Sequence, residues 1–370
     1  MPMILSSEAQ MVRDTALDFF RERSPVLALR KLRDSNDPDG FSRALWREMA
    51  ELGWTGFLVP EDHGGSDFGV TGLAQVMEAA GRTLAATPLL STALLGASLI
   101  ALGGNEDQKA EHLPPLVAGE RLFALALEEG PRHAPAKIAA TATVEAGGYR
   151  LNGSKRFVLD GHIADVLIVV AQSPNGIALF LVPGDAPGVT RTRTTMVDSR
   201  NAALVRLENV HVGKEALLRG GPDLLETVLD RARVALAAEM LGSASEAFER
   251  TVQYLKDRKQ FGVQIGTFQA LKHRAAQMFC EIEVTRSATI AACSALDEGG
   301  NEAAALAALA KGKANDTLFL CGNEGVQMHG GIGMTDEHEI GFFMKRARAA
   351  QATFGDSTFC KDRYAHLMGY

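Results

Sequence analysis

The chain has 370 residues, of which 46% are hydrophobic and 22% charged, and its 38 basic and 45 acidic residues give a formal net charge of -7. This length predicts two or three domains, and the composition is that of an ordinary protein with a hydrophobic core. The acidic balance, without a basic stripe or a block of like charge, argues against a nucleic acid partner.

The cysteines and the apolar stretches indicate the compartment. The four cysteines lie far apart and form no Cys-x-x-Cys pair, which fits free thiols in a reducing compartment and argues against a disulfide framework or a zinc site. Residues 1–10 show no secretion signal. The most apolar stretch, residues 88–102, is shorter than the roughly 20 residues that a bilayer span needs, so we expect a buried helix there. We predict a cytoplasmic protein without a membrane span or a metal site.

Hydrophobic periodicity divides the chain into three predicted domains. Residues 1–118 show the apolar spacing of helices, with Gly53 as a helix stop. Residues 119–217 change to the two-residue period of strands. Helical spacing returns over residues 218–370, where a Gly-Gly pair breaks the chain before an alanine-rich helix that begins near Glu302. Long helices with short connections suggest a bundle.

The middle domain is predicted to consist of short strands. They are separated by turn residues, and Gly147-Gly148 has the composition of a hairpin turn. The expected strands are residues 122–127, 141–145, 149–152, 166–171, 177–182 and 204–212.

Four short motifs lie outside what periodicity explains. They are Ala126–Gly130, Leu151–Gly161, Arg258–Gly262 followed by Gln269, and Gln327–Glu337. Together they resemble the acyl-CoA dehydrogenase family. The string Phe354-Gly355-Asp356 resembles in particular its small-subunit type, such as the pimeloyl-CoA dehydrogenase small subunit, which works beside a larger paralogue. The resemblance implies an α+β fold with an N-terminal helical domain, a middle antiparallel β domain and a C-terminal four-helix bundle. It also implies FAD between the last two domains and across a subunit interface.

The resemblance assigns cofactor contacts to the two C-terminal motifs. The family counterpart of Arg258 contacts the flavin pyrophosphate of a neighbouring subunit, a task that suits a guanidinium fork. Phe261 is expected to pack on the cofactor, and Gln269 belongs to the same signature. The segment 327–337 is similar to the one that wraps the ADP half of FAD, where glycines let the backbone approach a ligand closely. Its expected contacts are Gln327, Gly330 and Gly331.

The two motifs of the middle domain depart from the family in part. Phe157 occupies the place of the aromatic residue behind the isoalloxazine ring, but Leu159 stands where a threonine commonly bonds the flavin. Leu127 and Glu128 stand in the family's Leu-Thr position, so a flavin-contacting threonine has become a glutamate. Ser357, near the C-terminus, is a further expected cofactor contact.

The family's catalytic glutamate is missing. The family reaction removes a proton from Cα of an acyl-CoA and passes a hydride from Cβ to the flavin, which requires a positioned carboxylate. A Tyr-Glu-Gly-Thr string commonly supplies it, and the matching residues here are Phe354–Ser357, which puts Gly355 at the glutamate position. Some relatives carry the base at the position of Ala232 instead. The adjacent Arg233 matches the family well and is expected at the substrate.

Three carboxylates are candidates for the missing base. Asp356 is the first, because it is one residue from the expected place, and the alternative for it is a cap or loop hydrogen bond. Glu239 lies seven residues after Ala232, on the same helix face but roughly 10 Å along it. Glu128 is the third, since it could point toward the flavin.

Three functions remain open at this stage. The leading hypothesis is FAD-dependent α,β-dehydrogenation of an acyl-CoA, within acyl-CoA catabolism, with electron-transfer flavoprotein as the electron acceptor. The expected assembly is a homotetramer or an α2β2 heterotetramer with a paralogue. The second hypothesis is a non-catalytic partner subunit that completes a paralogue's FAD site. The third is a flavin oxidase or monooxygenase on the same scaffold.

Overall fold

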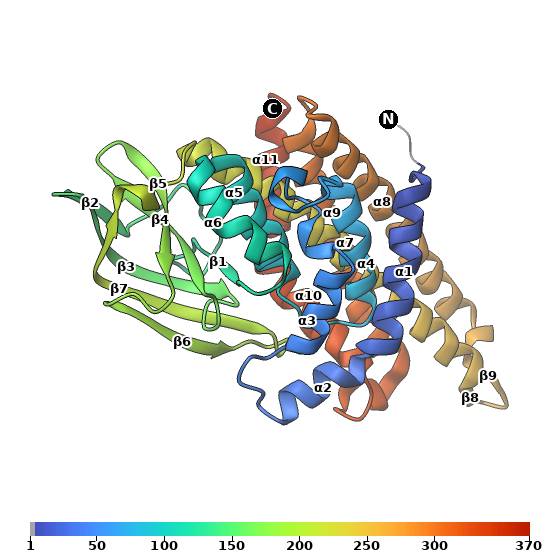
Figure 1. The fold of residues 1–370 in the computed structure, drawn as a ribbon. Coiled ribbons are helices and arrows are strands. Elements are labelled where there is room, and N and C mark those ends of the chain that lie inside the picture. Colours follow the sequence, from blue (N-terminus) through green and yellow to red (C-terminus); the bar gives the residue numbers. More distant parts are fainter. Residues whose placement is uncertain (1–3) are drawn as a thin grey trace. The chain divides into compact units, whose positions relative to one another are not determined.

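The protein divides by its internal contacts into two units, each assembled from separated stretches of chain (Figure 1). The structure is a computed structural model that describes residues 4–370. Unit 1 contains the residues up to Lys31, Val70–Ala85 and Arg233–Tyr370, and unit 2 contains Leu32–Gly69 and Ala86–Ala232. Contacts divide the chain differently from periodicity, which predicted three contiguous domains. Part of the first predicted domain lies in unit 1 and the rest lies in unit 2.

Unit 2 carries strands β1 to β7, drawn in green in Figure 1. Its helical segments are α3 (Arg43–Glu51), the short turns η1 (Trp54–Gly56) and η2 (Glu61–His63), the π-helix η3 (Leu89–Gly96), α5 (Ala97–Gly103), α6 (Glu106–Val117) and the turn η4 (Lys214–Ala216). Its strands are β1 (Phe123–Ala126), β2 (Thr141–Glu145), β3 (Gly148–Leu159), β4 (Val166–Ser173), β5 (Gly176–Pro183), β6 (Val189–Thr195) and β7 (Asn201–Gly213).

The strands form one mixed sheet in the order β1-β4-β2-β3-β7-β6, with β5 paired to β4. Most of its strand pairs are antiparallel, as expected, but β4 runs parallel to β1 and, at Thr141 and Gln172, to β2. The reason is topological: the β2–β3 hairpin, turned at Gly147 as expected, is inserted in the chain between β1 and β4. Alternate residues of the strands, mostly alanine, valine and leucine, form the core of the sheet.

Two features of the sheet differ from the expected strands. Strand β6 was not expected, because its sequence alternates threonine with arginine and contains one aliphatic residue. Strand β3 continues to Leu159 instead of ending at Asn152, and its pairing with β7 shifts register between Lys155 and Val158. A register shift of this kind is a β-bulge, which re-aims the side chains that it contains.

The apolar stretch expected as a buried helix is helical and buried. It begins as the π-helix η3 and continues as α5, and every residue of η3 is buried. Among residues 4–370, no helix combines the length and the apolarity of a membrane span.

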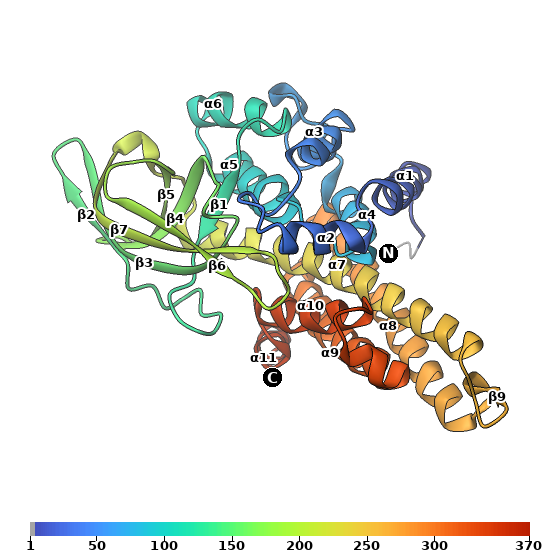
Figure 2. The same cartoon turned by 90° about the horizontal axis from the view of Figure 1, so that it is seen from below.

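Unit 1 is built from helices. They are α1 (Ser7–Arg23), α4 (Gly69–Arg82), α8 (Gln269–Glu298), α9 (Ala303–His329), α10 (Ile340–Ala352) and α11 (Ser357–Leu367), with the turns η5 (Ile265–Thr267) and η6 (Gly330–Met334) and the short strands β8 (Lys259–Gln260) and β9 (Val263–Gln264). Helices α2 (Val26–Asp34) and α7 (Gly221–Asp257) run from one unit into the other. Helix α9 packs against α8, α10 and α11, and Figure 2 shows α8 and α9 side by side.

Helices α4 and α7 cross at two glycines within unit 1. A Cβ atom on Gly81 would overlap the backbone carbonyl of Glu239, and a Cβ atom on Gly242 would overlap that of Glu78. The contact is reciprocal, so each helix needs a glycine at the place where it meets the backbone of the other.

We predict that Gly242→Ala destabilises the protein by about 1–3 kcal/mol, the usual cost of forcing an extra methyl group into a packed contact. The control is Gly341→Ala in α10, where the new Cβ would meet its nearest atom, the Gly333 carbonyl oxygen, at an ordinary 3.5 Å. Alanine is the better helix former, so this control should be neutral or slightly stabilising. Urea unfolding of both variants measures the difference, and equal stabilities would contradict the assignment.

Candidate functional site

A buried ion pair fixes the segment that follows β1. Lys155 is fully buried, and its Nζ donates to Glu129 Oε1 at 2.6 Å and to the Leu127 carbonyl at 3.2 Å. Glu129 also accepts from the backbone N–H groups of Ala139 and Ala140. Burial raises the pKa of Glu129, but these donors outweigh it and leave the pKa below its ordinary value. Glu129 therefore fixes the predicted cofactor contacts Leu127 and Glu128, which directly precede it in the sequence.

Glu128 has a partner of its own. One carboxylate oxygen lies 2.5 Å from Nδ1 of His133, and the other accepts weakly from the Ala134 N–H at 3.4 Å. The His133 side chain is almost completely buried. Leu127, the other expected contact in this motif, is also buried. This carboxylate is thus engaged by an imidazole in unit 2.

Phe157 lies in the bulge of β3 and faces solvent. Its φ of +51° is left-handed, which is uncommon for a bulky residue, and 43% of its surface is exposed. The preceding N–H, of Arg156, donates to the Glu128 carbonyl at 2.7 Å and so ties the bulge to the Glu128 segment. An aromatic ring held outward by a strained backbone is a feature that marks binding sites more often than cores.

The Arg258 motif forms a hairpin at the end of α7. Strands β8 and β9 pair across Phe261 and Gly262, both left-handed. The Phe261 side chain is 92% exposed and makes an edge contact with Phe268. Arg258 and Gln269, at the two ends of this motif, are exposed as well. The three residues predicted to contact a cofactor thus belong to one short, solvent-facing segment.

The glycine-rich motif follows α9 and lies close to that hairpin in unit 1. The ring of His329 stacks on Tyr254, which is one helical turn before Arg258, with centroids 4.4 Å apart. Gly330 ends α9 with a φ of +65°, and a Cβ atom on Gly330 or Gly331 would meet open space. Gln327 is exposed. The structure therefore brings together the two predicted C-terminal motifs, through a tyrosine that lies outside both of them.

Arg233 is bonded inside unit 1. It is fully buried, its Nε donates to the Phe354 carbonyl at 3.1 Å, and its guanidinium lies 5.5 Å from the centre of the Phe359 ring. Within unit 1 this residue supports the loop between α10 and α11, and its contact with the substrate stays a prediction.

Two further buried donors hold the same loop. Lys311 Nζ donates to the carbonyls of Gly355 and Ala350, both at 3.1 Å, and to Asn315 Oδ1 at 2.5 Å. Asn315 Nδ2 donates to the Gly355 carbonyl at 3.1 Å. Burial lowers the pKa of Lys311 to about 7. Phe354 and Gly355 thus have both carbonyls fixed by donors that are themselves inaccessible to water.

The candidate bases of unit 1 are engaged in other contacts. Asp356 is the N-cap of α11, where its Oδ1 accepts from the Phe359 N–H at 2.8 Å, and the adjacent Ser357 Oγ donates to Asp316. Glu239 is buried and receives two hydrogen bonds from Arg346, at 2.8 and 3.0 Å. Both carboxylates are thus committed to contacts within unit 1.

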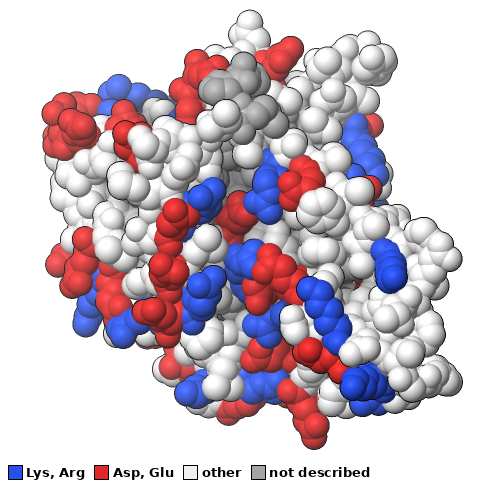
Figure 3. All heavy atoms as spheres, turned by 90° about the vertical axis from the view of Figure 1, so that its right-hand side faces the viewer, with Lys and Arg blue, Asp and Glu red and all other residues white. Residues whose placement is uncertain are grey.

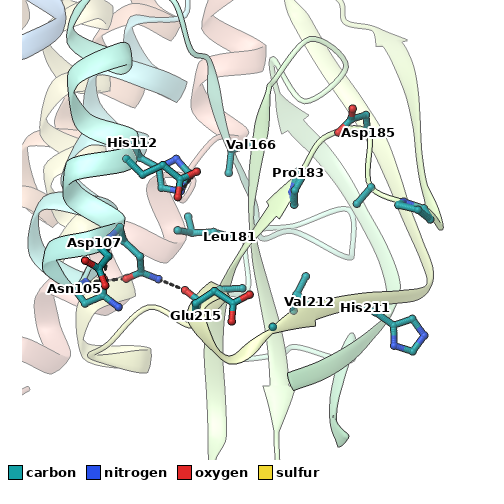
Figure 4. Close-up of a pocket in the computed structure, with 16 residues that line it drawn as sticks. Asn105, Asp107, His112, Val166, Leu181, Pro183, Asp185, His211, Val212 and Glu215 are labelled. Carbon is teal, nitrogen blue, oxygen red and sulfur yellow. Dashed lines mark hydrogen bonds and ion pairs between the residues drawn. The ribbon is translucent and has the colours of Figure 1, made fainter. Parts of the chain in front are cut away.

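An open pocket of about 720 Å³ lies in unit 2 but contains none of the predicted residues. It is lined by α6, by β4, β5 and β7, and by the loop after β5 (Figure 4). The side chain of Gln108 bridges its floor by donating to the backbone carbonyls of Glu215 and Leu217. The aromatic side chains of its lining are two histidines, so it does not resemble a site for a large flat ring.

Family models match almost the whole chain. The N-terminal domain model of acyl-CoA dehydrogenases matches residues 6–120, the middle domain model residues 125–210, and the C-terminal domain model residues 219–366. The "Probable acyl-CoA dehydrogenase YngJ" of Bacillus subtilis (strain 168) is 32% identical over an alignment of 370 positions, which covers 95% of this chain and 96% of that protein. The chain belongs to the acyl-CoA dehydrogenase family.

Two solved structures of this family share the fold over its full length. One is a single-residue variant of a protein described as "Tcur3481-Tcur3483 steroid ACAD"; it is 34% identical, has a TM-score of 0.90, and the match covers 98% of this chain and 97% of that one. The other is the ChsE4-ChsE5 complex from Mycobacterium tuberculosis, 26% identical with a TM-score of 0.92, and the match covers 100% of this chain and 99% of that one. The helical N- and C-terminal domains and the β middle domain expected from the family resemblance are confirmed.

Several residues that organise the site of this acyl-CoA dehydrogenase were not singled out from its sequence. They are Lys311, Asn315, Phe359, His133 and Tyr254. One signal was available: Lys311 and Asn315 are four residues apart on a helix that is otherwise rich in alanine, so they share a face. The sequence could not tell whether that face was buried.

We predict that Lys155→Met destabilises the protein by about 3–5 kcal/mol, because it leaves the Glu129 carboxylate without its buried counter-ion. The double variant Lys155→Met with Glu129→Leu removes both charges and should recover much of that loss. Urea unfolding of the three proteins tests this, and a single variant as stable as the wild type would show that the pair is dispensable.

The lowered pKa of Lys311 predicts that the stability of the protein depends on pH. Its pKa is lowered from an ordinary 10.5 to about 7 on folding, so between these values the unfolded chain binds more protons than the folded one. The unfolding free energy should therefore rise as pH increases from 7 toward 10.5, by on the order of a few kcal/mol. Lys311→Met should abolish this rise, while Lys256→Met, at an exposed lysine of α7, should keep it. Chemical unfolding at about pH 7 and pH 10 distinguishes the two, and an unchanged slope in Lys311→Met would be the contrary result.

Proposed function

We propose that the chain is one subunit of an FAD-dependent acyl-CoA dehydrogenase and that a second, glutamate-bearing chain supplies the base. The observation that carries this proposal is the state of the loop at Gly355. The glutamate position has no side chain, and the three candidates, Asp356, Glu239 and Glu128, are bonded to a helix end, to Arg346 and to His133. Membership of the acyl-CoA dehydrogenase family supports the reaction class, and the two-chain names of the similar structures support the second chain.

The exposed residues of the motifs fit FAD, the family's cofactor. Phe157 offers an aromatic face on a bulge of unit 2. In unit 1, Arg258 and Phe261 offer a guanidinium and an aromatic ring on one hairpin, and Gly330 and Gly331 leave room for a ligand to approach the backbone. A guanidinium suits a diphosphate, and aromatic rings suit the flat parts of the cofactor. Bound FAD would accept the hydride from Cβ of the acyl group.

The apolar exposure of unit 1 supports an oligomer. Large apolar side chains are exposed on the hairpin and along α8 and α9: Phe261, Val263, Phe268, Phe279, Val284, Leu309 and Phe319. In Figure 3 acidic and basic side chains alternate over much of the face shown, and a broad area at its side is uncharged. Large apolar side chains exposed in this number on one hairpin and two packed helices are typical of subunit interfaces. We therefore propose a tetramer, either of this chain alone or with a paralogue.

The family and the similar structures support a choice of electron acceptor and of acyl group. Electron-transfer flavoprotein is the proposed acceptor, as for the family reaction. One similar structure is that of a steroid ACAD, which supports a bulky polycyclic acyl-CoA as the substrate over an acyl-CoA with a straight acyl chain. Comparison of the two kinds of acyl-CoA in the same flavin-bleaching assay tests this choice.

We predict that Arg258→Ala weakens FAD binding by about 1.5–3 kcal/mol, the range for hydrogen bonds to charged groups. The matched control is Arg150→Ala on β3, an arginine that is also part-exposed and whose Nε pairs with Glu145. FAD retained after gel filtration, and titration of the apoprotein, measure both variants. Equal retention would remove the assignment of Arg258.

We predict that the chain purified alone shows no bleaching of flavin absorbance with acyl-CoA, and that its complex with a glutamate-bearing paralogue does. Asp356→Asn is the second arm, because it keeps the shape and removes the basic oxygen. If the chain alone is active and Asp356→Asn slows flavin reduction by at least roughly 100-fold, Asp356 is the base and the two-chain proposal fails. Rapid reoxidation of reduced flavin by oxygen would favour an oxidase or monooxygenase instead.

A further inference from the structure

The glutamate position of this chain has no room for a side chain. Gly355 has a φ of +116°, a backbone conformation that residues with a Cβ rarely adopt. A Cβ atom built there would lie 2.5 Å from Cδ1 and 3.2 Å from Cγ of the Phe359 ring. Real Cβ atoms do not approach a carbon atom at 2.5 Å, so even alanine requires the ring or the backbone to move.

The ring is held from two sides. Phe359 lies in the first turn of α11, and its N–H donates to the N-cap carboxylate of Asp356. The guanidinium of Arg233 lies 5.5 Å from the ring centre, within the range of a cation–π contact. The next residue, Cys360, is fully buried. Movement of the ring away from Gly355 would therefore break its contact with a buried arginine, and movement of the Phe359 backbone would disturb the start of α11.

The backbone is held as firmly as the ring. Turning residues 354 and 355 into an ordinary conformation would reorient their carbonyls, which accept from Arg233, Lys311 and Asn315. All three donors are fully buried, and two of them are basic groups. Leaving such donors without acceptors is among the costlier changes inside a protein.

We propose that Phe359 closes the glutamate position and that Arg233, Lys311 and Asn315 hold it closed, so that substitution of Gly355 by glutamate alone cannot restore a base to this chain. Phe359 and the three donors are positioning residues for the loop. The statement that a base would stand at position 355 rests on the proposed function. The statement that the Phe359 ring occupies the space at this position does not rest on it.

The test is a double-mutant cycle on thermal stability, made on the full chain without acyl-CoA. Gly355→Ala should lower the Tm by several degrees, and Phe359→Ala should lower it as well. In the double variant the methyl group occupies space that the ring has vacated, so the combined loss should be smaller than the sum by at least about 2 °C. Gly299→Ala is the control for backbone strain, because its φ is +69° and its Cβ would meet open space. It should combine additively with Phe359→Ala.

If the Tm losses of Gly355→Ala and Phe359→Ala add in the double variant, as those of Gly299→Ala and Phe359→Ala should, the proposal that Phe359 closes position 355 is wrong. A second arm introduces the carboxylate: Gly355→Glu should have a lowered Tm and show no flavin bleaching when purified alone. If that single variant keeps the wild-type Tm and bleaches its flavin with acyl-CoA, the position is open and the proposal is wrong. Failure of the proposed function is recognised separately, since it concerns bleaching in the two-chain complex and leaves the stability cycle unaffected.

Discussion

The loop between α10 and α11 depends on a buried lysine amino group that donates to uncharged oxygen atoms. Lys311 donates to two backbone carbonyls and to the amide oxygen of Asn315. Oxygen dipoles compensate a charge less completely than a counter-ion does, which is consistent with the lowered pKa of this lysine. The geometry of the loop, and through Arg233 that of Phe359, is thus fixed by groups that the solvent does not reach.

The two units hold their predicted contact residues in place by different kinds of interaction. In unit 2 the segment after β1 is held by a lysine that does have a carboxylate partner, Glu129, and the strained bulge at Phe157 is attached to that segment by a backbone hydrogen bond. In unit 1 the exposed hairpin is attached to the glycine-rich loop by stacked rings rather than by charges. In each unit, residues outside the predicted contacts hold the residues that the family resemblance marks as contacts.

Much of the fold could be predicted from the sequence because apolar periodicity and turn residues encode it directly. Strand β2 and the hairpin turn at Gly147 follow from alternation and from a Gly-Gly pair. Strand β6 could not be predicted in this way, because both its faces carry polar residues and the pairing with β7 makes it a strand. The parallel pairing of β1 with β4 is likewise a property of the topology, which strand-length segments do not contain.

The predicted contact residues that lie in motifs are exposed, whereas the buried residues that hold them in place were not singled out from the sequence. The motif residues Arg258, Phe261 and Phe157 are solvent-facing, as residues that bind a ligand should be. Arg233 has the sequence context of a substrate contact, but its role depends on a carbonyl 121 residues away in the chain. No local pattern reports such a partner, and the same holds for the pairing of Glu128 with His133 across a Gly-Pro turn.

The contact between Gly355 and Phe359 also bears on how such a chain can change over generations. Loss of a glutamate at this loop is a single event that can be reversed by a single event, as long as the space stays vacant. Where an aromatic ring fills that space, as Phe359 does here, a residue with a side chain is unfavourable at position 355. Reversal then requires the ring to be lost first, with no benefit until both changes are present. Dependence on a second chain would in this way be entrenched by packing, without any continuing selection for the partnership itself.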